Sequence, residues 1–166
     1  MKDDVFFEET QSTHTTNTYE TTRNKPMPSY NHGSIQANLI FLIKLGYDEK
    51  YRPVSELTLN LDDWLSVPDI SIYPFEVLDT DNDTIKTTIP PLCAIEILSP
   101  TQSLTELLFK ARTYFEKEVK SCWLVLPGVN NIYVFSSAKE YEIFKMNETL
   151  VDEKLNIKIE MAKVFR

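Results

Sequence analysis

The chain has 166 residues, 42% of them hydrophobic and 25% charged, and its formal net charge is −8. These values predict one soluble globular domain with a substantial core. The acidic balance argues against a broad nucleic-acid-coating surface, which would be basic. It leaves room for a small basic cleft, or for a site where a metal offsets the charge of its own carboxylates.

Sequence patterns exclude several other classes of protein. No apolar run reaches membrane-spanning length and the N-terminal MKDDVFFEET lacks a signal-peptide pattern, so we expect a cytoplasmic protein without membrane contact. With only 3 glycines and no glycine-rich phosphate loop, nucleotide binding by backbone is disfavoured, and neither CxxC nor HExxH occurs. Cys93 and Cys122 lie in predicted buried strands, which favours core thiols over a disulfide.

The chain divides into a polar N-terminal arm, residues 1–17, and a single domain, residues 18–166. A helix is predicted from His32 to Leu45, with Asn31 as its N-cap and Gly46 as its end. Its apolar stripe consists of Ile35, Leu39, Leu42 and Ile43. A histidine at a helix start is typically a surface or capping residue.

Strands, a turn and a loop follow this helix. We predict one or two strands in residues 50–61 and a turn at residues 62–64. In the next strand, over 67–73, Asp69 lies on the face opposite Ile70 and Ile72. Residues 79–88 carry a DxDxD pattern that lacks the glycine and the final glutamate of an EF-hand, so we predict a solvated loop.

Glu96 is the most informative residue. The run from Leu92 to Leu98 is apolar on both faces except at Glu96, which predicts a central strand covered on both sides. A carboxylate there must be paired, protonated or metal-bound, because an isolated buried charge is costly. A structural ion pair and a functional site both remain open at this point.

A helix over 103–118 is the best-defined element, with a predicted buried stripe of Leu104, Leu107, Leu108, Ala111 and Phe115. Lys110 falls off this stripe, four residues after Glu106, which favours a surface ion pair. The apolar strand over 121–126 should lie parallel to 92–98 through a right-handed βαβ crossover. Antiparallel strands are expected at 132–135 and 141–146, and a last strand at 155–159. The fold class is therefore α/β, a mixed β-sheet flanked by helices.

Several segments together resemble the Uma-type family of restriction-like endonucleases, within the PD-(D/E)xK nuclease superfamily. The most specific match is EILSP with a lysine 11 residues after its serine, followed by a WLVxP strand. The matching segments are MPSYNHGSIQANL (27–39), VPDISIYP (67–74), AIEILSPT (94–101), CWLVLPGVNNIYVF (122–135) and LNIKIEMAKVF (155–165). The resemblance implies a restriction-endonuclease-like core.

The resemblance also implies a site. Asp69 and Glu96 match its metal ligands for Mg²⁺ or Mn²⁺, and we expect the Ile97 backbone carbonyl to join them. The superfamily's usual strand lysine position holds Leu98, and the family lysine matches Lys110 in the following helix. The remaining candidates are Glu106 to position Lys110, Gln102 or Ser103 to contact phosphate, and His32 and Glu20, which match family positions but favour a structural interpretation.

The function that follows is metal-dependent phosphodiester hydrolysis by a DNA endonuclease, with DNA implied by family analogy alone. The alternative is a catalytically inactive binding or assembly module, which the charge of −8 and the missing strand lysine favour. Hydrolysis of another phosphoester is a third hypothesis. A homodimer is an open alternative to a monomer.

Overall fold

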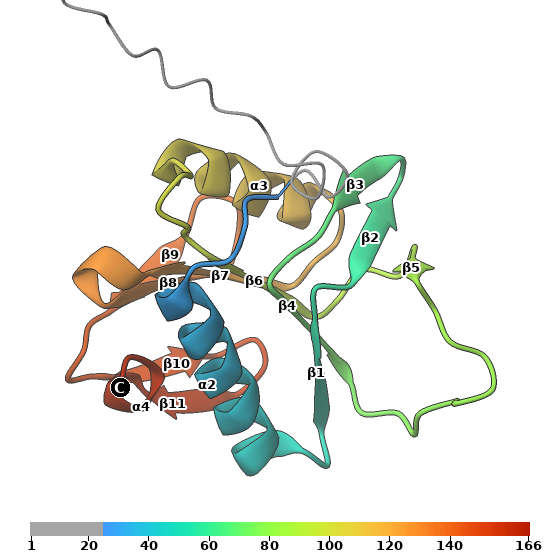
Figure 1. The fold of residues 1–166 in the computed structure, drawn as a ribbon, viewed down its shortest axis with the longest axis horizontal. Coiled ribbons are helices and arrows are strands. Elements are labelled where there is room, and N and C mark those ends of the chain that lie inside the picture. The colour runs from blue at the N-terminus through green and yellow to red at the C-terminus, as the bar shows by residue number, and fades with distance from the viewer. Residues whose placement is uncertain (1–24) are drawn as a thin grey trace, which may run out of the picture.

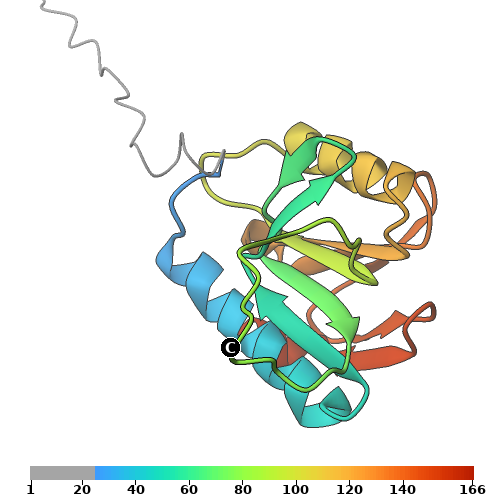
Figure 2. The same ribbon diagram turned by 90° about the vertical axis from the view of Figure 1, so that its right-hand side faces the viewer.

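A six-stranded mixed β-sheet forms the centre of residues 25–166, the part of the chain that the computed structural model describes (Figure 1). Its strand order is β1-β4-β6-β7-β8-β9. The bounds are β1 Tyr51–Ser55, β4 Ile70–Pro74, β6 Cys93–Ile97, β7 Ser121–Leu126, β8 Asn131–Phe135 and β9 Tyr141–Phe144. Helix α2 (Tyr30–Tyr47) covers one face and α3 (Leu104–Glu116) the other, as the turned view of Figure 2 also shows.

Smaller elements surround this sheet. Strands β3 (Trp64–Ser66), β2 (Thr58–Leu61) and β5 (Lys86–Thr87) form a three-stranded sheet in that order. Strands β10 (Thr149–Asp152) and β11 (Ile157–Glu160) pair antiparallel, and the short helix α4 (Met161–Val164) follows. A 3₁₀ turn, η1 (Pro127–Val129), joins β7 to β8. Within the described residues, no helix is long and apolar enough to cross a lipid bilayer.

The parallel pairing of β6 with β7 confirms the βαβ crossover, because α3 connects these two strands. The other neighbouring strands of the large sheet pair antiparallel, so the sheet is mixed and the predicted fold class is confirmed.

Alternation along the central strands divides the core in two. Ile95 and Ile97 pack into the cluster on the α2 side, whereas Ala94 packs into the cluster on the α3 side. Since successive side chains of a strand point to opposite faces, Glu96 lies on the α3 side. Cys93 and Cys122 are buried free thiols, and burial raises the pKa of both well above the usual range, as expected for core cysteines.

The predicted ends of α2 were wrong. Ser29 is the N-cap, because its backbone is extended and its Oγ accepts a hydrogen bond from the His32 N–H at 3.3 Å. At the other end the helix continues through Gly46 to Tyr47. Gly46 does not adopt the left-handed conformation that would end a helix, so the glycine signal was misleading here.

The buried face of α3 is rotated from the predicted stripe. Its buried residues are Leu107, Ala111 and Tyr114, whereas Leu104 is 36% exposed. Tyr114 is absent from the predicted stripe and is fully buried, so its hydroxyl needs partners inside the protein. It finds them in Glu96 and Ser66.

Three short strands escaped prediction: β3, β5 and β10. Asp62 and Asp63 do form a turn, with φ of 49° and 63°, and it closes a hairpin between β2 and β3. Trp64, which was predicted to belong to this turn, is instead the first residue of β3. Strands of two to four residues carry too little alternation to be recognised. The 79–83 segment is an exposed loop as predicted, and its Asp79 accepts hydrogen bonds from the backbone of Asp81 and Asn82.

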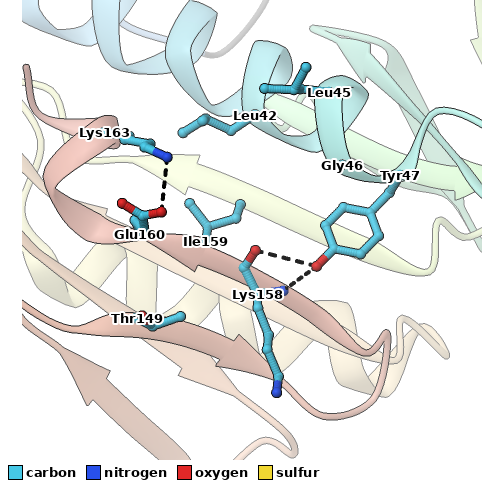
Figure 3. A pocket seen from close by; sticks show the side chains of 9 residues that line it. All are labelled: Leu42, Leu45, Gly46, Tyr47, Thr149, Lys158, Ile159, Glu160 and Lys163. Carbon is cyan, nitrogen blue, oxygen red and sulfur yellow. Dashed lines mark hydrogen bonds and ion pairs between the residues drawn. The ribbon is translucent and has the colours of Figure 1, made fainter.

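A shallow surface hollow lies between the end of α2 and β11 (Figure 3). The Lys158 N–H donates to the Tyr47 hydroxyl at 2.6 Å, and Lys163 pairs with Glu160 at 2.9 Å. The α2 residues of this hollow begin at Leu42, so roughly 15 Å of helix separates them from His32. The hollow is therefore separate from the polar residues at the beginning of α2.

Candidate active site

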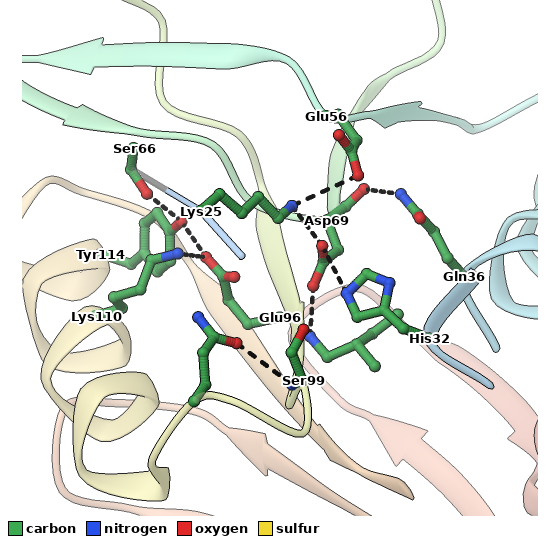
Figure 4. Close-up of polar contacts among 12 residues, drawn as sticks. Lys25, His32, Gln36, Glu56, Ser66, Asp69, Glu96, Ser99, Lys110 and Tyr114 are labelled. Carbon is green, nitrogen blue, oxygen red and sulfur yellow. Dashed lines mark hydrogen bonds and ion pairs between the residues drawn. The ribbon is translucent and has the colours of Figure 1, made fainter. Parts of the chain in front are cut away.

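Asp69 and Glu96 face each other across two adjacent strands. In the antiparallel pair of β4 and β6, Ile70 lies opposite Ile95, so one further step places Asp69 opposite Glu96. Directly opposed residues of an antiparallel pair share a face of the sheet. Both residues are almost fully buried, with 1% and 2% of their surface exposed. The sheet therefore brings two acids together inside the protein (Figure 4).

Both carboxylate oxygens of Asp69 have partners. Its Oδ2 accepts a hydrogen bond of 2.6 Å from the Ile97 N–H, on β6. Its Oδ1 forms an ion pair with Lys25 and lies 3.0 Å from His32 Nε2. Gln36 donates to the Asp69 backbone carbonyl at 2.7 Å. Asp69 thus joins the central sheet to the first turns of α2 and to the segment before it.

Asp69 is ionised at neutral pH. Burial alone would raise the pKa of Asp69, but the contact from His32 and the positive charge of Lys25 outweigh burial. Together they hold the pKa of Asp69 below its usual value. The site therefore contains a buried negative charge that depends on neighbouring cationic groups.

Glu96 has a different set of partners, on the α3 side. Its Oε1 lies 2.6 Å from Lys110 Nζ and accepts a hydrogen bond of 2.6 Å from the Tyr114 hydroxyl. Burial and the negative charge of Glu96 raise the pKa of Tyr114 well above its usual value, so this hydroxyl keeps its proton. Ser66 Oγ lies 2.6 Å from the same hydroxyl, which it can supply with a second hydrogen bond.

The predicted surface pair of Lys110 with Glu106 is not formed. The Lys110 side chain is 21% exposed and turns to Glu96. The exposed Glu106 completes a capping box instead: its carboxylate accepts from the Ser103 N–H at 3.0 Å, and its own N–H donates to Ser103 Oγ at 3.3 Å. Lysine can extend over apolar surface to place its ammonium group, which explains why helical position alone was misleading.

We refer to these six residues as the Asp69–Glu96 cluster: Lys25, His32, Asp69, Glu96, Lys110 and Tyr114. Comparisons with known proteins show which family the chain belongs to. A family model described as "Uma2: Putative restriction endonuclease" matches residues 19–162. The chain belongs to the Uma2 family. The predicted family is thereby confirmed.

A solved structure shares the Uma2 fold of this chain. It is the crystal structure of "a putative nuclease belonging to DUF820 from Anabaena variabilis ATCC 29413". The TM-score is 0.73, the sequence identity is 24%, and the match covers 84% of this chain and 83% of that one. At this identity the likeness establishes the fold alone. Among curated proteins, none matches the chain.

The structure places the other candidate residues of this Uma2 protein as follows. His32 is 2% exposed and contacts Asp69, so the surface or capping interpretation was wrong. Gln102 accepts a hydrogen bond from the Ser99 N–H at 3.3 Å, close to Glu96 in the chain, and Ser103 caps α3. Glu20 and the 1–17 arm lie outside the described residues.

Sequence reasoning missed two members of the cluster, for different reasons. Lys25 lies in a proline-containing segment without periodicity, where no pattern could indicate its contact with Asp69. Tyr114 lies in the predicted helix over 103–118 but outside its predicted buried stripe. A signal for it existed, because it lies three residues after the buried Ala111 and so continues the same helix face.

The carboxylate oxygens of the cluster fit a metal ion that has few protein ligands. Among residues 25–166, no group of three His, Cys, Asp or Glu side chains could hold a metal ion. Asp69 and Glu96 nevertheless supply two buried carboxylates. Mg²⁺ is usually held by one or two carboxylates and completes its shell with water and substrate phosphate. The cluster is therefore compatible with a metal that is bound together with its substrate.

Proposed function

We propose that this Uma2 protein is a divalent-metal-dependent endonuclease that hydrolyses phosphodiester bonds of DNA. The observation that carries the proposal is the burial of Asp69 and Glu96 opposite each other, with Lys110 on Glu96 at 2.6 Å. The family description, "Putative restriction endonuclease", supports this proposal, and the crystal structure of the same fold is described as that of "a putative nuclease".

Asp69 and Glu96, with the Ile97 backbone carbonyl, would hold Mg²⁺ or Mn²⁺. A bound divalent ion supplies an acidified water and offsets charge on the phosphate. Carboxylates suit this role, because magnesium and manganese prefer oxygen ligands. The hydrogen bonds from Ile97 and Tyr114 already orient one oxygen of each acid.

Lys110 would act on the reacting groups. Its side chain is 21% exposed, which would leave it accessible to substrate while it remains in contact with Glu96. In this position it can orient the attacking water and stabilise the negative charge that develops on the phosphate. Tyr114 contacts neither reacting group. It holds Glu96 from the buried side and is a positioning residue.

A second candidate function is a non-catalytic binding or assembly module with the same fold. Two observations favour it: the net charge of −8, and the pairing of both acids with lysines, which balances their charge without a metal. An enzyme that hydrolyses another phosphoester at the same cluster would be a further variant of the main proposal.

Cleavage assays on supercoiled and single-stranded DNA decide between these functions. We expect wild-type protein to cleave with Mg²⁺ or Mn²⁺ and to stop when EDTA removes the metal. Lys110→Ala should reduce cleavage by at least about 100-fold, the scale for loss of one electrostatic donor. Its Mn²⁺ affinity should stay equal or rise, because a neighbouring cation is removed.

Matched variants make the assay specific. Lys44→Ala removes a 55% exposed lysine of α2 that pairs only with Asp48 at 3.4 Å among the contacts of the described residues, and should leave cleavage unchanged. Glu96→Gln should abolish cleavage. Activity that survives in Lys110→Ala and disappears in Glu96→Gln would remove Lys110 from the mechanism and leave the metal site. Inactive wild-type protein, across metals and substrates, would favour the binding module.

A further inference from the structure

Lys25 places a buried ammonium group inside the candidate active site. Its side chain is 9% exposed and forms an ion pair with Asp69 Oδ1, while Glu56 Oε1 lies 3.6 Å from the same nitrogen. In Figure 4 the ammonium group points between these two carboxylates. A positive charge therefore already occupies the oxygen of Asp69 that a metal would need.

The other partners of Asp69 are held by the fold. The Ile97 N–H belongs to the backbone of a strand in the centre of the sheet. His32 lies in the first turn of α2 and is 2% exposed, and its backbone N–H donates to the Ser29 cap. The Ile97 N–H cannot leave Asp69 without opening the sheet, and the His32 ring is buried on a helix. Lys25 is the one of these three partners that lies outside a helix or strand.

Lys25 is held differently. It precedes α2 in a segment, residues 25–29, that has no helix or strand. Pro26 and Pro28 have no N–H, so this segment cannot pair through those positions with a strand. Within the described part of the chain, Lys25 Nζ has no hydrogen-bond partner of good geometry, so charge holds the contact.

The segment is also stiff. The two proline rings restrict the backbone, so residues 25–28 should move as one piece about the start of α2. Figure 1 shows this segment in blue, running from the side of α3 to the first turn of α2. A movement of the segment away from the cluster would carry the Lys25 ammonium group off Asp69 without disturbing α2.

We propose that Lys25 is an internal cation that competes with the divalent metal for Asp69, and that residues 25–28 move outward when the metal binds. This inference rests on the proposed metal-dependent function. Without metal, Lys25 compensates the buried charge of Asp69. With metal, the divalent ion replaces it. Metal affinity then depends on how much more strongly Asp69 binds the divalent ion than the Lys25 ammonium group. The position of residues 25–28 differs between the metal-free and the metal-bound site.

Chemical labelling of lysines in the wild-type full chain tests the movement directly. We expect an amine-reactive reagent to modify Lys25 slowly without metal and at least about fivefold faster with excess Mn²⁺, measured by mass spectrometry. Lys44, 55% exposed and remote from the cluster, is the internal control and should react equally in both conditions. Equal protection of Lys25 with and without Mn²⁺ would overturn the proposal. This measurement needs no variant and so does not depend on whether a mutant folds.

Calorimetric titration with Mn²⁺ tests the competition. Lys25→Gln should bind Mn²⁺ at least about tenfold more tightly than wild type, while Lys44→Gln should match wild type. Equal or weaker binding by Lys25→Gln, with binding lost in Asp69→Asn, would refute the competition and leave the metal site in place. Binding that persists in Asp69→Asn, or is missing from every protein, would overturn both the competition and the proposed metal site.

Discussion

Among residues 25–166, buried carboxylates occur at two places, and their partners differ in kind. In the Asp69–Glu96 cluster, each acid contacts a lysine: Lys25 on Asp69 and Lys110 on Glu96. The second group surrounds Asp152, which is 1% exposed. We call it the Asp152 cluster; its donors are Ser121 Oγ at 2.5 Å, Trp123 Nε1 at 2.7 Å and the Leu155 N–H at 3.1 Å.

The two sets of partners suit different tasks. The donors to Asp152 are neutral, come from β7 and the β10–β11 hairpin, and are themselves buried, so they hold this hairpin against the main sheet. Each acid of the Asp69–Glu96 cluster also accepts a neutral hydrogen bond, from the Ile97 N–H or the Tyr114 hydroxyl, but it contacts a lysine as well. The lysine ammonium groups can be exchanged for another cation, whereas a backbone N–H or a buried indole cannot. Burial of an acid alone is therefore a weaker indication of a site than the charge of its partners.

Of the substitutions that distinguish the two clusters, Asp152→Asn is expected to have the largest effect, on the free energy of unfolding. An amide nitrogen at this position must face a donor that cannot accept, because the Trp123 and Leu155 nitrogens only donate. We expect a loss of about 2–3 kcal/mol in the free energy of unfolding, measured by urea denaturation. Cleavage and Mn²⁺ affinity per folded molecule should stay within about twofold of wild type, because sites without shared partners act nearly independently. Loss of metal binding would contradict the separation of the clusters.

Tyr114→Phe should have an intermediate effect. It removes the hydroxyl that touches Glu96 and Ser66, while Lys110 remains on Glu96. We expect about 1 kcal/mol less stability and about tenfold slower cleavage, because an orienting hydrogen bond behind a metal ligand is lost. Ser66→Ala, which leaves the Tyr114–Glu96 bond in place, is the matched control. Unchanged cleavage in Tyr114→Phe, despite the loss of stability, would limit Tyr114 to a structural role.

The smallest effect is expected for Asp79→Asn, in the exposed 79–83 loop. Its carboxylate accepts from the Asn82 side chain and from the backbone N–H groups of Asp81 and Asn82, and these hydrogen bonds lower the pKa of Asp79. Metal binding raises the melting temperature of a folded protein by mass action. The rise caused by millimolar Mn²⁺ should be the same in Asp79→Asn as in wild type, and should disappear in Asp69→Asn and Glu96→Gln. A rise that depends on Asp79 would place the metal on the loop.

Local patterns predicted the framework of this protein well. The run around Glu96, the helix after it and the strand over 121–126 contain the βαβ unit in one continuous stretch, so periodicity and connection length were sufficient. The same stretch indicated that Glu96 is buried. It also led to the family, since the EILSP motif and Lys110 lie within it.

Contacts between segments that are distant in the sequence could not be predicted from local patterns. Lys25 meets Asp69 across 44 residues of chain (from 25 to 69), and Asp152 meets Trp123 across 29. Neither residue shows its role locally: Lys25 lies beside two prolines and Asp152 ends a four-residue strand. His32 was misassigned for the same reason, because only the tertiary structure brings a buried carboxylate to the start of α2. The catalytic and metal-binding roles of the cluster remain predictions.

Crystals soaked with Mn²⁺ would test the central claim most directly, because anomalous scattering locates the ion without reference to activity. We predict one peak in contact with the carboxylates of Asp69 and Glu96, and displacement of the Lys25 ammonium group from Asp69. A peak confined to the 79–83 loop would contradict the proposed metal site. So would a cluster without manganese, with Lys25 still on Asp69, at concentrations that support cleavage.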